Sequence, residues 1–259
     1  MNSIELKIEN NIAFIELNRP EVFNSFNREM ALKLQDTLDA CEKNEDVRVI
    51  VVTGNGKAFC AGQDLKEVTS DKLNPGFKKI LEEHYNPIIT RIRKIEKPVL
   101  AAVNGVAAGA GANIALACDV VVASEHASFI QAFSLIGLIP DSGGTFFLPR
   151  LVGFQKASAL AMLGDKISAI EAERLGMVYK VFPSDTFEEE VHNLALKLAV
   201  MPTKALILIK KSLNQSLNND LESQLGLESK YQIEAAGTED YAEGVAAFIE
   251  KRKPNFKGR

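Results

Sequence analysis

Short apolar runs that end in glycine-bearing turns constrain the fold of this chain more than any other feature. VRVIVVT at 47–53 ends at GNG, and VLAAV at 99–103 ends at Asn-Gly. A third run, VVVAS at 120–124, is also rich in β-branched residues. Such runs are typical of strands that are buried on both faces of a sheet. Segments of helical spacing, 77–95 and 109–117, lie between them, and another, 27–43 with Asn27 as a plausible N-cap, precedes the first. The alternation predicts an α/β core with parallel strand pairing.

The two ends of the chain depart from this alternation. Residues 4–8 and 12–17 are short runs joined at Asn10-Asn11, which predicts a β-hairpin. After about residue 155 the spacing is almost entirely helical. Five helices are expected there, at 168–175, 186–199, 202–216, 219–235 and 238–250. Their apolar positions are too many for one chain to bury, so we expect packing on the core or on a second subunit.

Composition limits the classes of protein that the chain can belong to. Its 259 residues suit one large domain or a domain with an appendage, and 46% apolar with 25% charged residues is ordinary for a globular protein. Three widely spaced cysteines, Cys41, Cys60 and Cys118, follow no zinc or iron–sulfur pattern. We therefore expect no metal, reduced thiols and a cytoplasmic location.

Charge and hydropathy indicate which partners to expect. The N-terminus does not resemble a signal peptide, and no apolar stretch is long enough to span a bilayer, so no membrane contact is expected. The net charge of −4 argues against a nucleic-acid surface. The last residues, KRKPNFKGR, are strongly basic, and two interpretations are open: a solvated, frayed tail or a phosphate-binding tail.

Three glycine-bearing turns are the places where the sequence suggests chemistry: GNGKAFCAGQDL at 54–65, NGVAAGAGAN at 104–113 and GLIPDSGG at 137–144. Glycine after a strand lets the backbone approach a ligand and point N–H groups at it. The dinucleotide pattern GxGxxG fails because Ile114 stands at its sixth position. Three histidines, His84, His126 and His192, lie in polar helical or turn contexts and are expected at the surface. A Ser/His/Asp hydrolase is therefore disfavoured.

What remains is a pair of backbone-rich turns and one acid, Asp141. Two N–H groups aimed at one carbonyl oxygen form an oxyanion hole. A nearby carboxylate can remove and return a proton. This combination suits proton abstraction beside a thioester, although Asp141 before Ser-Gly-Gly is also a good helix N-cap.

Three runs closely resemble motifs of the crotonase, or enoyl-CoA hydratase/isomerase, superfamily: FCAGQDL at 59–65, AAVNGVAAGAGANIALACDVVVAS at 101–124 and GLIPDSGGTFFLPRLVG at 137–153. The resemblance covers essentially the whole chain. It implies a crotonase-like (ClpP/crotonase) spiral of ββα units at residues 1–195 and a helical trimerisation region at 196–259. It also implies an acyl-CoA thioester as substrate, no separate cofactor, and self-association as a trimer or hexamer.

The same resemblance assigns roles to individual residues. The oxyanion N–H groups belong to Gln63 and to Ala110, where many relatives have glycine. Coenzyme A is expected to run past residues 61–65. The remaining candidates for substrate or CoA binding are Ala61, Gly62, Asp64, Leu65, Gly109, Phe133, Ile139, Phe256 and Lys257.

Departures from the family pattern point to the reaction. Hydratases of the superfamily carry two glutamates that activate water, and here Asn113 and Phe133 occupy those positions. In the isomerase-like members an Asp at the position of Asp141 is the base that moves a proton. The resemblance therefore implies an isomerase of ring-epoxide phenylacetyl thioesters, in phenylacetate catabolism, or of 3,2-enoyl thioesters, in fatty acid metabolism. Two alternatives remain open: a hydratase with a substitute acid, and a non-catalytic member that binds CoA or RNA.

Overall fold

The computed structural model describes residues 2–259, and its larger sheet has six strands in the order β1-β2-β3-β5-β7-β10. The strands are β1 (Ile4–Glu9), β2 (Ile12–Leu17), β3 (Val49–Gly54), β5 (Val99–Val103), β7 (Val120–Ser124) and β10 (Lys180–Phe182). β1 and β2 pair antiparallel, which confirms the predicted hairpin, and the other neighbours pair parallel. The α/β core with parallel pairing is therefore confirmed.

A second sheet of four short strands was not predicted. Its order is β4 (Ala58–Cys60), β6 (Val106–Ala108), β8 (Ser128–Ile130) and β9 (Lys166–Ser168). β4, β6 and β8 each follow a strand of the larger sheet after a short connection, so the chain repeats a strand–strand–helix unit. Three-residue strands are too short to show a hydrophobic period, and the adjoining glycines made these segments look like loops.

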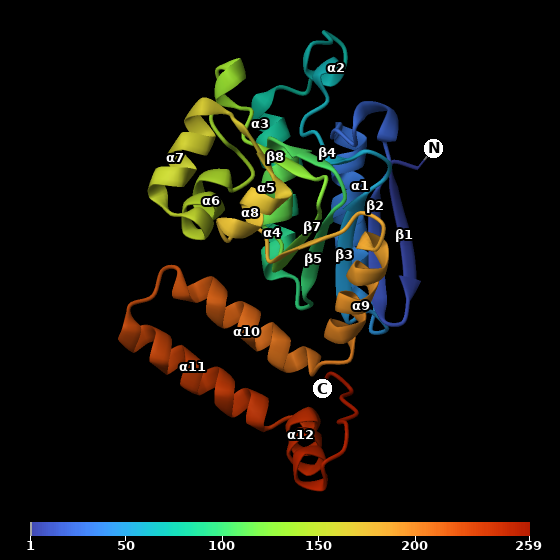
Figure 1. The fold of residues 1–259 in the computed structure, drawn as a ribbon, viewed down its shortest axis with the longest axis vertical. Helices are drawn as coiled ribbons and strands as arrows, with labels where there is room; N and C mark the ends of the chain where they lie inside the picture. The colour runs from blue at the N-terminus through green and yellow to red at the C-terminus, as the bar shows by residue number, and fades with distance from the viewer. Residues whose placement is uncertain (1) are drawn as a thin grey trace.

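Helices follow the strand pairs and cover the sheets (Figure 1). The helical elements before residue 200 are η1 (Pro20–Val22), α1 (Arg28–Lys43), α2 (Leu65–Val68), α3 (Phe77–Lys79), the π-helical η2 (Ile80–Tyr85), α4 (Asn86–Lys94), α5 (Ala110–Leu116), η3 (Ser134–Ile136), α6 (Gly144–Val152), α7 (Phe154–Leu163), α8 (Ala169–Arg174) and α9 (Phe187–Ala199). Asn27 caps α1 as predicted, because its side chain accepts a hydrogen bond from the Met30 N–H at 2.9 Å. α7 was not predicted, and α6 was expected only through the interpretation of Asp141 as a helix cap.

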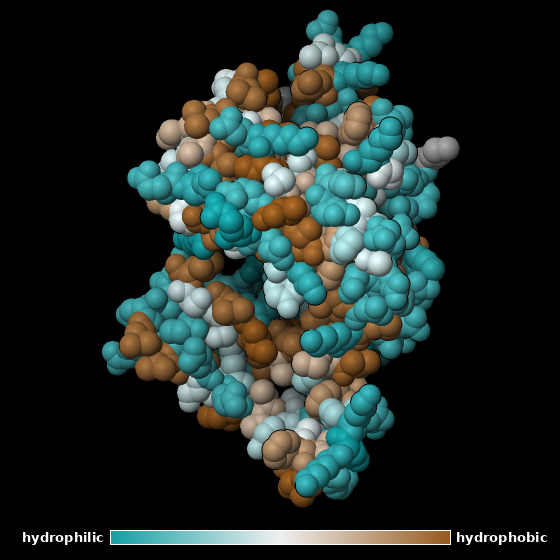
Figure 2. Space-filling model, viewed as in Figure 1, coloured by the Kyte–Doolittle hydropathy of each residue, from teal (hydrophilic) through white to brown (hydrophobic). Residues whose placement is uncertain are grey.

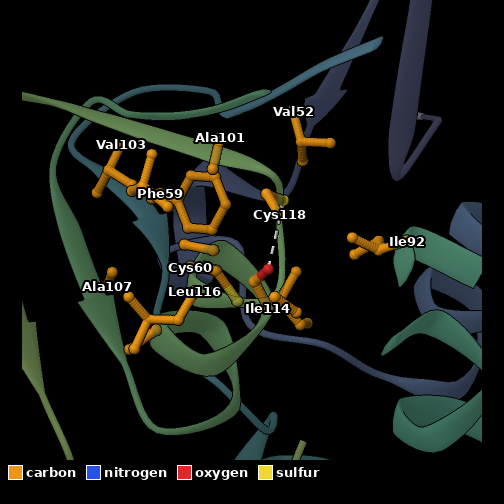
Figure 3. Packing of buried hydrophobic residues seen from close by; sticks show 14 of the residues in the cluster. Val52, Phe59, Cys60, Ile92, Ala101, Val103, Ala107, Ile114, Leu116 and Cys118 are labelled. Atoms are coloured by element: carbon orange, nitrogen blue, oxygen red, sulfur yellow. Dashed lines mark hydrogen bonds between the residues drawn. The ribbon is translucent and has the colours of Figure 1, made fainter. Parts of the chain in front are cut away.

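The main core lies where the two sheets meet α4 and α5. Figure 3 shows Phe59 and Cys60 of β4 facing Leu116 and Ile114 of α5, with Val103 of β5 beside them. All five side chains are buried. This packing fixes the start of α5 against the end of β4, which is where two of the glycine turns lie.

Three C-terminal helices extend away from the sheets: α10 (Thr203–Ser216), α11 (Leu221–Ala236) and α12 (Glu239–Glu250) (Figure 1). Lys210 anchors α10 to the core, because its ammonium lies 2.8 Å from Asp119 Oδ2 and donates to the carbonyls of Ile92 and Lys97. Figure 2 shows hydrophobic side chains gathered along these helices. They include Ile209, Leu213, Leu225, Ile233, Phe248 and Ile249, which are exposed. The expectation that one chain leaves these positions uncovered is confirmed, whereas the division at 195/196 falls within α9 and stays a prediction.

Of the two interpretations of the C-terminal tail, the frayed tail is wrong. The carboxylate of Asp240, which is 2% exposed, accepts hydrogen bonds from the N–H groups of Lys257 and Gly258 at 2.6 and 2.7 Å. Arg48 donates to the carbonyl of Phe256 at 3.0 Å. The tail is therefore held on α12 and on the core, since each of these contacts satisfies a backbone group.

The expectation of a surface histidine is also wrong at His84, which is 1% exposed. His84 lies four residues from each of Ile80 and Ile88, which are also buried, so it shares the face that packs inward. Burial, together with the charge of Arg28, lowers the pKa of His84. The burial of His84 is thus decided by its position in the helix and not by the polarity of its side chain.

Within residues 2–259, no single helix is both long and apolar enough to cross a membrane. The bent pair α9 and α10 would meet that test together, by length and composition only.

Candidate active site

Two of the glycine turns lie side by side at the ends of neighbouring strands. β4 and β6 pair parallel, and the turns at 61–63 and 109–110 follow their carboxyl ends. Gly62, with φ of +89°, approaches the second turn so closely that a Cβ there would lie 3.0 Å from the Ala108 carbonyl oxygen and 3.5 Å from the Ala110 nitrogen. Only glycine accepts both this φ and this approach without strain.

The backbone geometry leaves the N–H groups of Gln63 and Ala110 free for a ligand. Phe26 bonds to the residues on either side of Gln63, since its N–H donates to Gly62 and its carbonyl accepts from Asp64. Because successive N–H groups of extended backbone point to opposite sides, the N–H of Gln63 points away from Phe26. Ala110 has a negative φ and is the first residue of α5, where an N–H has no partner within the helix. Both predicted oxyanion donors are therefore brought together.

The side chain of Gln63 is held at both ends by residues that the sequence did not reveal as site residues. The Tyr85 hydroxyl donates to Gln63 Oε1 at 2.9 Å, and Gln63 Nε2 donates to Glu67 Oε2 at 2.8 Å. Glu67 Oε1 accepts the N–H of Arg28, the first residue of α1. Burial is the main reason that the pKa of Tyr85 is raised, so its hydroxyl stays a donor. Tyr85 is the last residue of the π-helical η2, and π-helical turns are frequent at functional sites. The spacing of apolar residues in the sequence does not distinguish a π-helix from an α-helix, so it could not mark Tyr85 as a site residue.

Asp141 lies in the third turn, between η3 and α6. Burial raises the pKa of its carboxyl, and a hydrogen bond of 2.8 Å from the Ser142 hydroxyl to Oδ1 partly offsets this. Ser142 has φ of +52°, which is unusual for a residue with a side chain. Raised carboxyl pKa values and unusual backbone angles are both common at functional sites.

The alternative interpretation of Asp141 as a helix cap is wrong. α6 begins at Gly144, the preceding Gly143 has no side-chain cap, and the Asp141 carboxylate accepts from Ser142 instead of from the helix. It is the Asp141 backbone carbonyl that accepts the Gly144 N–H, at 2.8 Å. The carboxylate is thus available for another partner.

Asn113 and Phe133 lie beside these groups. The Asn113 amide, which is fully buried, donates to the Asp141 carbonyl at 2.8 Å. The Phe133 ring lies 3.6 Å from where a Cβ of Gly109 would stand, so it borders the second turn. A buried amide and an aromatic ring therefore occupy the two positions at which the resemblance implies the glutamates of the superfamily's hydratases.

Other predicted binding residues divide into two groups. Ala61, Leu65 and Ile139 are exposed around the turns, while Asp64 is buried in an ion pair of 2.8 Å with Arg19 and caps α2 through Lys66 N–H. Phe256 and Lys257 follow α12 and are held against it through Asp240. In Figure 1, α12 and the C-terminus lie at the end of the molecule away from α2. One chain therefore does not bring the tail to the turns.

A groove lies elsewhere, away from the turns at 61–63 and 109–110. It has a volume of about 1060 Å³, and Glu5, Phe14, Thr53, Glu188 and His192 are among the residues that line it, over β1 to β3 and α9. None of the predicted site residues lines this groove. The backbone donors and the partly buried Asp141 point to the turns as the site, whereas none of these groups lines the groove.

Replacing Ser142 by Gly should move the acid side of the pH–activity profile to higher pH. A base must be ionised to act, and the Ser142 hydroxyl lowers the pKa of Asp141 against the effect of burial. Glycine tolerates the φ of +52° and removes only the hydroxyl. The measurement is kcat/KM for a CoA thioester as a function of pH. An unchanged profile would show that the Ser142 hydroxyl does not set the pKa of the group that acts as base.

Comparison with known proteins identifies the family. The model of the enoyl-CoA hydratase/isomerase family matches residues 7–259. The chain is 44% identical over 261 residues to the 1,2-epoxyphenylacetyl-CoA isomerase of Escherichia coli (strain K12), with 100% of both chains covered. It is 45% identical over 258 residues to a probable enoyl-CoA hydratase of Rhodobacter capsulatus, covering 100% of this chain and 99% of that one.

Solved structures agree with this assignment. A crystal structure described as enoyl-CoA hydratase subunit I of Geobacillus kaustophilus HTA426 matches with a TM-score of 0.92 and 38% identity, covering 99% of this chain and 98% of that one. The chain belongs to the enoyl-CoA hydratase/isomerase family, and the predicted crotonase-like fold is confirmed.

Proposed function

We propose that the protein is an acyl-CoA isomerase in which Asp141 moves a proton along an acyl chain. The thioester oxygen accepts hydrogen bonds from the N–H groups of Gln63 and Ala110, which stabilise the enolate that forms when a proton leaves carbon. Asp141 takes that proton and returns it at another carbon, so the product has the composition of the substrate. Partial burial raises the pKa of the Asp141 carboxyl and makes it a stronger base than a fully exposed aspartate.

One observation carries this proposal: Asn113 and Phe133, at the two positions where the resemblance implies the water-activating glutamates of hydratases, cannot activate water. Asn113 cannot transfer protons, and both polar ends of its amide are already engaged, with Gln131 and with the Asp141 carbonyl. Phe133 has no polar atom. Water addition needs a group that activates water and a proton donor, which leaves isomerisation as the chemistry that one base supports.

Glu67 is the acid that competes with Asp141, because it lies next to Gln63. Its two oxygens accept hydrogen bonds from the Arg28 N–H and from Gln63 Nε2, at 2.8 Å each. A carboxylate held in this way serves to fix its neighbours. We therefore assign the base to Asp141 and the support of the oxyanion turn to Glu67.

The similarity to the Escherichia coli 1,2-epoxyphenylacetyl-CoA isomerase supports a ring-epoxide thioester as substrate, converted to the isomeric oxepin. The same base can move a double bond from the 3,4 to the 2,3 position of an enoyl thioester. The exposed apolar face of α10 to α12 supports self-association as a trimer or hexamer. In such an assembly Phe256 and Lys257 would hold coenzyme A bound at a neighbouring subunit, because the glycine turns of their own chain are distant from them.

A panel of CoA thioesters with identification of the products tests the function. We expect aryl-epoxide or 3-enoyl thioesters to give products of unchanged mass, and crotonyl-CoA to keep its enoyl absorbance. Loss of that absorbance with addition of water would instead support the hydratase alternative, which the relative in Rhodobacter capsulatus keeps open. CoA binding without turnover of any thioester would support the non-catalytic alternative.

A further inference from the structure

We propose that Asn113 and Gln131 form a two-amide relay that positions the base Asp141, an inference that rests on the proposed function. Gln131 Nε2 donates to Asn113 Oδ1 at 2.8 Å, and Asn113 Nδ2 donates to the backbone carbonyl of Asp141 at 2.8 Å. Asn113 is fully buried and Gln131 is 3% exposed. These two residues touch the backbone of the base and not its carboxylate, so they are positioning residues.

The orientation of both amides follows from chemistry. A backbone carbonyl can only accept a hydrogen bond, so Asn113 must present its NH₂ group to Asp141. Its oxygen then faces Gln131, which must present its own NH₂ group in turn. The far oxygen of Gln131, Oε1, is buried and has no hydrogen-bond partner within residues 2–259. Both hydrogen bonds of the relay are therefore donated in the same direction, from Gln131 to Asn113 and from Asn113 to the Asp141 carbonyl.

The relay joins the base to the oxyanion hole through a short rigid path. Asn113 lies on α5, three residues after the oxyanion donor Ala110. Gln131 follows β8, whose last residue Ile130 accepts the N–H of Gly109 at 2.9 Å. Both members are thus tied to the turn that binds the thioester oxygen. A shift of the base relative to that oxygen would misplace the proton transfer.

The packing around Asn113 leaves little freedom for another residue. A Cβ on Gly144 would lie 2.4 Å from Asn113 Nδ2, so the start of α6 rests directly on the amide. A glutamate at 113, as in hydratases, would be longer and would set a carboxylate against the Asp141 carbonyl, an acceptor against an acceptor. Asparagine at this position therefore favours an isomerase with a fixed base over a water-activating site.

Replacing Asn113 by Asp keeps the size of the side chain but removes the donor to Asp141. We expect kcat to fall by about 10²-fold, the order of loss that a misplacement of about 1 Å produces, with a much smaller change in KM for the CoA thioester. The added negative charge should also raise the pKa of Asp141 and move the acid side of the kcat/KM profile to higher pH. A Gln131→Leu variant removes the far end of the relay and should lower kcat in the same direction but less.

A purely structural role gives a different result. In that case Asn113→Asp would lower Tm, while kcat per folded enzyme at a pH where Asp141 is ionised would match the wild type, and this outcome would overturn the relay. If Asn113→Asp does not fold, Gln131→Leu decides in its place, and a wild-type kcat would overturn the relay equally. Full activity of Asp141→Asn would instead sink the proposed function, so the two failures are distinguishable.

Discussion

Replacing Asp141 by Asn should lower isomerase turnover by about 10²–10⁴-fold, the range that loss of a general base produces. The amide matches the carboxylate in size, and its oxygen can still accept the hydrogen bond from the Ser142 hydroxyl that Oδ1 accepts in the wild type. The backbone carbonyl keeps its bonds from Asn113 and Gly144. The fold and KM for the thioester should therefore change little, and steady-state kinetics with circular dichroism measure both.

Glu67→Gln serves as the matched control for this change. It removes the charge of the other acid near Gln63; the amide oxygen can still accept from the Arg28 N–H, and only the hydrogen bond from Gln63 Nε2 is lost. We expect Glu67→Gln to retain far more turnover than Asp141→Asn. The reverse order would move the base from Asp141 to Glu67.

Replacing Ala110 by Pro should lower kcat/KM by about 10²–10³-fold, the loss expected when one oxyanion donor is removed. Proline has no N–H and places its ring where the hydrogen pointed, so the thioester oxygen loses a donor and room. The cost to folding should be small, because Ala110 is the first residue of α5, and proline is well tolerated at that position. Kinetics beside thermal melting separate the two effects.

Ala110→Gly is the matched control, because it keeps the N–H and removes only the methyl group. We expect its kcat/KM to stay within a few fold of the wild type, together with a small loss of helix stability of up to about 1 kcal/mol. Equal losses in both variants would place the cause in the packing of α5, and the oxyanion role of Ala110 would then be wrong.

Much of the fold could be predicted from periodicity alone. β3, β5 and β7 are apolar runs that end in turns, and α9 to α12 show helical spacing. These strands and helices were therefore predicted within a few residues of their observed bounds. The second sheet could not be predicted, since β4, β6 and β8 have three residues each and are fixed by their neighbours. Gly105 shows why: a Cβ there would lie 2.1 Å from the Lys57 carbonyl oxygen, a contact between segments far apart in sequence.

The site was predictable where a motif carries it, and not where distant segments meet. Gln63, Ala110 and Asp141 stand in glycine turns that the sequence marks directly. Tyr85 and Glu67 join the site only because η2 and α2 fold over the Gln63 turn. The docking of the tail on Asp240 likewise depends on a contact across 17 residues that no local pattern shows.

The products formed from a 3-enoyl-CoA thioester by the wild type and by Asp141→Asn test the central claim most directly. With product mass and enoyl absorbance followed together, the wild type should give the 2-enoyl isomer at unchanged mass, and Asp141→Asn should give almost none. A hydrated product from the wild type, or undiminished isomerisation by folded Asp141→Asn, would contradict the assignment of Asp141 as the base that moves the proton.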